Sequence, residues 1–183
     1  MNANMWVDPL LPVPVSVEPG VDQRRLAAYH EAGHAVAHVL FRLKFAEVHI
    51  VPGETSGGAL ITAGCGPWWP PSRRWVKRKV IALLAGPTAQ IRARGYHGGE
   101  PFFDVGADHD MTHARALAST CYYDQRRVLA YVKTLHLRAV RLWEVPEYWR
   151  AVQAVAQSLL LQPYGWLPSA AVRLIVRTEL AAA

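Results

Sequence analysis

Apolar side chains recur at intervals of three and four residues through most of the chain, which places them on one face of an α-helix. The first such run covers about residues 23–43, with Asp22 suited to capping its start. Further runs predict a helix from about residue 73, another from about residue 108, and three more up to residue 180. The pattern therefore predicts a mainly α protein.

Prolines mark the expected breaks between these helices. Gly86-Pro87 falls inside the second run, where proline removes a backbone donor, so we expect a kink or a restart there. Pro146 stands where the first position of a helix is expected, a position that proline favours. The segment Pro163–Pro168 is expected to form a turn between the last two helices.

A strict alternation of side chains replaces the helical spacing just after the first helix. Val48 and Ile50 fall on one side of Glu47–Pro52, which predicts a strand, and Gly58–Thr62 predicts a second strand that completes a hairpin. The expected fold class is thus α+β, mainly α with a small hairpin or sheet. Such a strand could pair with an extended peptide substrate or simply close the core, and the sequence leaves both readings open.

Residues 1–22 differ from the rest because four prolines alternate there with valines and other apolar residues. Proline favours extended backbone, so we expect an extended arm at 1–22, followed by one domain at 23–183. A chain of 183 residues is long enough for one domain with a sizeable core.

Composition is that of a globular protein, with 51% hydrophobic and 19% charged residues. The net charge of +6 favours acidic partners without specifying one. Cys65 and Cys121 lack metal-site spacing, so a reduced, cytoplasmic location is expected. No run of about 20 mostly apolar residues predicts a transmembrane segment.

The first predicted helix carries the pattern His-Glu-x-x-His at His30, Glu31 and His34. Residues four apart share a helix face, so the two imidazoles can converge on one Zn²⁺ ion. Glu31 is then placed to accept a proton from metal-bound water, the arrangement of zinc hydrolases. His38 continues the spacing, but a third ligand on the same helix would lie too far along its axis, so we interpret it as a neighbouring polar residue. Gly33 predicts another element packed closely against this face.

A third protein ligand must come from elsewhere in the chain. Residues 101–113 hold the densest set of candidates, and several of them could equally be helix caps. The candidates are Asp104, Asp108, His109, Asp110 and His113, of which Asp108 suits a capping role. The spacing alone leaves the choice open.

Four segments stand out in chain order: 29–35 with the histidine pair, Ile50-Val51-Pro52, Leu84-Ala85-Gly86 and Gly106-Ala107-Asp108-His109-Asp110. Together they resemble the peptidase domain of FtsH-type AAA proteases, a helical zincin-like domain. The resemblance covers about residues 23–180 and implies that Asp110 is the third zinc ligand. It departs from the family at Pro87 and Gln90, where the family usually has an arginine and an acidic residue.

The resemblance implies a zinc metallopeptidase that cleaves unfolded proteins or peptides, with Glu31 as the general base. It also implies a homo-oligomer, a hexamer in that family. The family's ATPase module is not recognisable here, so a separate ATPase partner is a further expectation.

The alternative is a catalytically silent, metal-stabilised interaction module that docks through the tryptophan and basic segment 68–79. Trp68 and Trp69 precede a run of cations that begins at Arg73 and Arg74. An intact Glu31 argues against this reading, because a structural metal site needs no general base. Binding of nucleic acid through the same cations is a third and less favoured interpretation.

Overall fold

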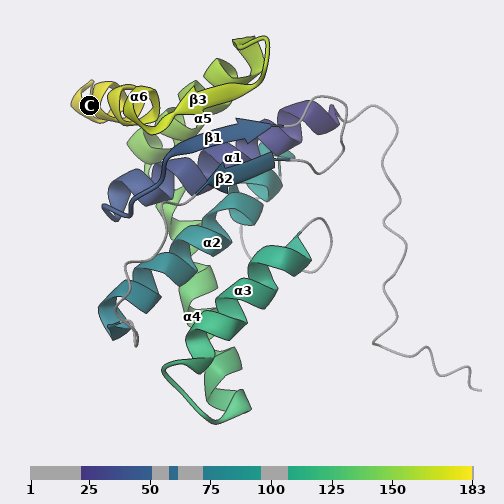
Figure 1. Cartoon of the computed structure of the whole chain (residues 1–183), viewed down its shortest axis with the longest axis vertical. Helices are drawn as coiled ribbons and strands as arrows, with labels where there is room; N and C mark the ends of the chain where they lie inside the picture. The colour runs from purple at the N-terminus through teal and green to yellow at the C-terminus, as the bar shows by residue number, and fades with distance from the viewer. Residues whose placement is uncertain (1–21, 51–57, 62–71, 96–106, 183) are drawn as a thin grey trace, which may run out of the picture.

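The computed structural model describes residues 22–50, 58–61, 72–95 and 107–182, which form six helices and three short strands (Figure 1). In chain order these are α1 (Gln23–Leu40), β1 (Glu47–Ile50), β2 (Gly58–Ile61), α2 (Arg73–Ala93), α3 (Ala107–Ser119), α4 (Gln125–Leu142), α5 (Pro146–Leu161), β3 (Trp166–Pro168) and α6 (Ser169–Ala181). The predicted mainly α fold with a hairpin after the first helix is confirmed. Residues 1–21 of the expected N-terminal arm, and Trp68 and Trp69 of the segment 68–79, lie outside the described residues.

The sheet is antiparallel, and its strand order is β2-β1-β3. In the hairpin, Val48 lies opposite Leu60, and on the other side of β1 it lies opposite Leu167. The prediction of a plain turn at 163–168 was wrong, because its last three residues form β3. A three-residue strand is too short to show alternation, and Pro168 is tolerated because β3 is an edge strand.

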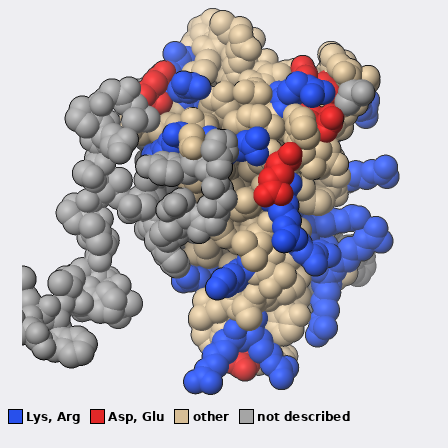
Figure 2. Space-filling model, turned by 180° about the vertical axis from the view of Figure 1, so that it is seen from behind, with Lys and Arg blue, Asp and Glu red and all other residues tan. Residues whose placement is uncertain are grey.

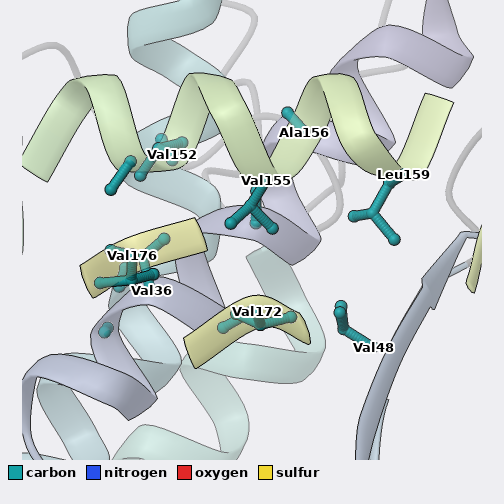
Figure 3. Packing of buried hydrophobic residues seen from close by; sticks show 14 of the residues in the cluster. Val36, Val48, Val152, Val155, Ala156, Leu159, Val172 and Val176 are labelled. Carbon is teal, nitrogen blue, oxygen red and sulfur yellow. The ribbon is translucent and has the colours of Figure 1, made fainter. Parts of the chain in front are cut away.

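Helix α1 crosses the centre of the molecule and contacts α2, α5, α6 and the hairpin (Figure 1). It permits such close packing because six of its eleven buried residues are alanine or glycine, and Val36 is its largest fully buried side chain. Valine and leucine side chains of α5 point toward Val36 and toward Val172 and Val176 of α6 (Figure 3). Each such side chain contributes roughly 1.5–3 kcal/mol when fully buried. A second cluster joins α2, α3 and α4.

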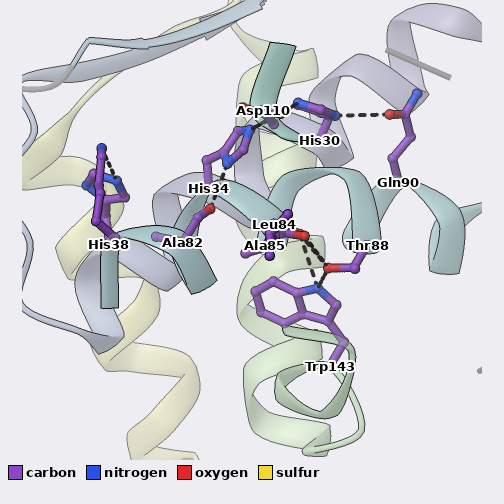
Figure 4. A network of polar contacts seen from close by, with 11 residues as sticks. His30, His34, His38, Ala82, Leu84, Ala85, Thr88, Gln90, Asp110 and Trp143 are labelled. Atoms are coloured by element: carbon purple, nitrogen blue, oxygen red, sulfur yellow. Dashed lines mark hydrogen bonds and ion pairs between the residues drawn. The ribbon is translucent and has the colours of Figure 1, made fainter. Parts of the chain in front are cut away.

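Helix α2 runs through Pro87 without restarting, so the expectation of a restart was wrong. Side chains support the backbone around the proline. The Thr88 hydroxyl donates to the carbonyl oxygens of Leu84 and Ala85, at 2.9 and 3.0 Å. The indole N–H of Trp143 donates to the Ala85 carbonyl and to the Thr88 hydroxyl (Figure 4). Hydrogen bonds within α2 and from Trp143, just after α4, thus hold together a turn that proline weakens.

Two helix starts bear on the site. Asp22 caps α1, because its side chain accepts a hydrogen bond from the backbone N–H of Arg25. Helix α3 begins at Ala107, so Asp108 lies inside its first turn and the interpretation of Asp108 as the cap was wrong. Among the helices of the described residues, none is long and apolar enough to cross a membrane.

Candidate metal centre

Two helices bring three ligand-type side chains together. His30 and His34 project from α1, and Asp110 projects from the first turn of α3 (Figure 4). The two Nε2 atoms lie 3.0 Å apart, and Asp110 Oδ2 lies 3.1 Å from that of His30 and 3.2 Å from that of His34. The three atoms therefore form a nearly equilateral triangle.

This triangle fits a tetrahedrally bound ion. With ligand bonds of about 2.0–2.1 Å, two ligands of tetrahedral Zn²⁺ stand about 3.3–3.4 Å apart. The observed separations are shorter by only a few tenths of an ångström. Two imidazoles and one carboxylate also form a three-ligand set of the kind that catalytic zinc sites use, with one coordination position left over. His30, His34 and Asp110 are thus able to hold a metal ion.

The other nitrogen of each imidazole is held from α2. The Nδ1–H of His34 donates to the Ala82 carbonyl at 2.8 Å, and Nδ1 of His30 lies 3.0 Å from Gln90 Oε1. An acceptor at Nδ1 places the proton there and leaves the Nε2 lone pair free for a metal. Sequence reasoning missed this role of Gln90, noting it only as a departure from the FtsH pattern. A backbone carbonyl such as that of Ala82 carries no signal in the sequence.

Glycines let α1 and α2 approach closely enough for these contacts. A Cβ atom at Gly86 would lie 2.3 Å from His34 Nε2. A Cβ atom at Gly33 would lie 2.7 Å from the Ala85 carbonyl oxygen, so the predicted close packing at Gly33 is confirmed. The Leu84-Ala85-Gly86 segment is therefore part of the wall behind the histidines.

Electrostatics tie the ligands together. Burial alone would lower the pKa of His34, but the hydrogen-bonded Asp110 carboxylate and the nearby Glu31 raise it to about 9. Burial would raise the pKa of Asp110, yet the adjacent imidazoles hold it well below its usual range. His34 and Asp110 are thus a buried pair of opposite charges. A divalent cation placed there competes with the His34 proton for the same Nε2 atom.

Glu31 is buried beside this triangle and lacks a complete set of partners. It is 6% exposed, and its Oε2 atom has no hydrogen-bond partner among the described residues. Burial is the largest influence on the pKa of Glu31 and raises it, against the opposing effects of His34 and His30. Leaving a buried carboxylate oxygen without a hydrogen-bond partner is costly. The structure thus keeps an acid–base group next to the ligands.

The remaining candidates lie away from the triangle or outside the described part of the chain. His109 and His113 are exposed on α3, with ring centroids 4.1 Å apart. Asp104 is not among the described residues, and Asp108 is described by its backbone alone. His38 is buried one turn beyond His34, with Nε2 3.2 Å from Lys79 Nζ. Of the described side chains that were candidates, Asp110 is the one that joins the histidine pair.

Comparisons with known proteins add no family assignment. No protein-family model matches the chain, and no curated protein matches it either. The resemblance to FtsH-type peptidases therefore rests on the sequence motifs alone.

Proposed function

We propose that the protein is a zinc-dependent endopeptidase that cleaves unfolded polypeptides. The observation that carries the proposal is the triangle of His30, His34 and Asp110 with the buried Glu31 beside it. A purely structural metal site would need the three ligands alone. A buried carboxylate with a free oxygen is instead what general-base catalysis requires.

Each residue of the site has a distinct role. His30 and His34 present Nε2 lone pairs that are fixed by the acceptors Gln90 and Ala82. Asp110 brings one negative charge to the site, and zinc supplies Lewis acidity and makes water a stronger acid there. Glu31 accepts the proton of the attacking water and later passes it to the leaving amine. Its pKa, raised by burial, is closer to neutrality than that of an exposed glutamate, which suits both transfers.

The sheet is a further reason to propose a polypeptide substrate. Strand β2 pairs with β1 on one side and lies at an edge of the sheet. An extended chain could add to such an edge through backbone hydrogen bonds, which accept many sequences. From the two cysteines without metal-site spacing we further propose a cytoplasmic location. By resemblance to the FtsH-type domain we propose assembly into a hexamer, and substrates that are either already unfolded or delivered by a separate ATPase.

The test uses zinc-loaded protein and an unfolded substrate such as casein. Wild type should cleave it, and both a chelator and Glu31→Gln should reduce the rate by about 100-fold or more, where 100-fold is the lower limit of the range for loss of a general base. Glu144→Gln, at an exposed position beyond α4, is the matched control and should leave the rate unchanged. A zinc-loaded, folded Glu31→Gln variant with unchanged activity would refute the proposal. Folded, zinc-loaded wild type without cleavage would favour the silent module.

A further inference from the structure

The outward face of α4 is strongly basic. Val128, Val132, Leu135 and Ala139 pack inward, and the helix contains no acidic residue. Its opposite side carries five exposed cations, Arg126, Arg127, Lys133, Arg138 and Arg141. A helix needs polar residues on its solvent face, but ordinary solvation is served equally well by mixed charges.

The start of α2 extends this surface. Arg73 and Arg74 are exposed in the first turn of α2. The guanidinium of Arg73 lies 5.7 Å from the ring centroid of Tyr122, which in turn lies 5.1 Å from the ring of Tyr131 on α4. These contacts join the two helices, and we call the five α4 cations together with Arg73 and Arg74 the basic face. In the lower half of Figure 2 the charged side chains are almost all Lys and Arg.

Among the described residues, few carboxylates neutralise the basic face. Asp124 lies 3.9 Å from Arg127, and both side chains are largely exposed. Within the described ranges, the other six cations take part in no recorded ion pair. An exposed pair of this kind contributes little to stability, and like charges on one face repel each other. The charge therefore favours an external anionic partner.

Apolar side chains on the same helix narrow the choice of partner. Leu137 lies four residues after Lys133 and four before Arg141, in the middle of the outer face, and is 47% exposed. Leu129 is also exposed, and Tyr123 is fully exposed just before the helix. Phosphate groups of a nucleic acid gain nothing from a leucine at the centre of the contact. A lipid bilayer accepts cations at its headgroups and leucine or tyrosine side chains at the acyl boundary.

We propose that the basic face docks the protein on an anionic lipid surface. The helix lies parallel to that surface, with its cations at lipid phosphates and carboxylates and with Leu137 directed inward between them. Docking through α4 and the start of α2 uses none of His30, Glu31, His34 or Asp110. The inference is therefore independent of the proposed peptidase activity.

The test is sedimentation of the full chain with vesicles of phosphatidylserine and phosphatidylcholine, compared with vesicles of phosphatidylcholine alone. The protein should bind the anionic vesicles and should be released by salt. Each cation near such a surface contributes about a fivefold gain in affinity, so Lys133→Glu with Arg141→Glu should weaken binding by about 30-fold or more. Lys44→Glu with Arg177→Glu changes the net charge equally at exposed positions outside the basic face and should have a small effect.

Leu137→Ser separates a lipid from a nucleic acid. Its side chain is half-exposed, so losing its insertion should weaken vesicle binding by about fivefold. Binding of a DNA duplex, measured on the same variants, should be weaker than vesicle binding and indifferent to Leu137→Ser. Three results would overturn the proposal: no binding to anionic vesicles at low salt, equal losses in the two double variants, or tighter binding of DNA with vesicle binding unaffected by Leu137→Ser.

Discussion

Gln90 offers the sharpest test of how the metal centre is built. Its Oε1 lies 3.0 Å from His30 Nδ1, and the residue is buried on α2. Gln90→Met removes the acceptor while keeping a side chain of similar length and helix preference. The corresponding acceptor of His34 is the Ala82 carbonyl, which no substitution can remove. Of the two acceptors that hold the imidazoles, Gln90 is therefore the one that a substitution can remove.

The size of the effect follows from the tautomers of His30. A bound metal requires the lone pair at Nε2, so the proton must stay at Nδ1 and face the position of Gln90. In the metal-free protein the proton can move to Nε2 and be donated to Asp110, 3.1 Å away. Removing the Gln90 acceptor therefore destabilises the metal-bound state more than the metal-free state. Removal of such a partner typically costs 10–100-fold in metal affinity, or about 1.4–2.7 kcal/mol.

The measurement is competition for Zn²⁺ between the protein and a chromophoric chelator. Gln90→Met should raise the Kd for zinc by 10–100-fold, and Gln90→Glu, whose carboxylate is a stronger acceptor, should lower it. Thermal unfolding of both metal-free variants controls for general damage. A Kd for Gln90→Met within twofold of wild type would refute the idea that Gln90 fixes the His30 tautomer.

The other predictions follow from single contacts. In the same competition assay, Asp110→Asn should weaken zinc binding by at least about 100-fold. His109→Asn and His113→Asn should leave zinc binding unchanged. A larger loss of zinc affinity for either histidine variant than for Asp110→Asn would exclude Asp110 as the third ligand. Gly86→Ala should abolish zinc binding, because the added Cβ would lie 2.3 Å from His34 Nε2; in an open helix the same change stabilises by about 1 kcal/mol, so unimpaired binding with higher stability would contradict the packing. Burial, helped by Lys79 on α2 and by His34, lowers the pKa of His38 to about 3, so that between this value and about 6.5 the unfolded chain binds one more proton than the folded chain. The free energy of unfolding should therefore decrease as the pH is lowered below 6.5, by up to about 1.4 kcal/mol per pH unit. His38→Gln should remove this contribution, which amounts to about 2 kcal/mol between pH 7 and pH 5 in urea unfolding. Equal pH dependence in the two proteins would show that His38 is not buried as a neutral group.

Local pattern predicted the elements that are long or strongly periodic. The spacing of apolar residues identified α1 and α4, and the alternation around Val48 identified the hairpin. It failed at β3, where three residues carry no period. At Pro87 it left a kink or a restart open, and α2 continues without a restart while Thr88 and Trp143 make hydrogen bonds beside the proline.

The sequence likewise predicted only part of the candidate site. The pair His30 and His34 is fixed by helix geometry, which the sequence contains. The choice of Asp110 depends on how α3 is rotated against α1, and from the sequence it came only through resemblance. Gln90 meets His30 across 60 positions of chain, a contact set by the packing of α1 on α2 through Gly33 and Gly86. No local pattern encodes such a pairing, and the same holds for Lys79 and His38.

Anomalous diffraction at the zinc edge from crystals of the zinc-loaded protein tests the central claim most directly. The account predicts one dominant peak at about 2.0–2.2 Å from His30 Nε2, His34 Nε2 and an Asp110 carboxylate oxygen. Glu31 should lie beside the ion without ligating it. A dominant peak at another site, such as the exposed pair His109 and His113, or a peak at the histidine pair with Asp110 turned away, would contradict the account.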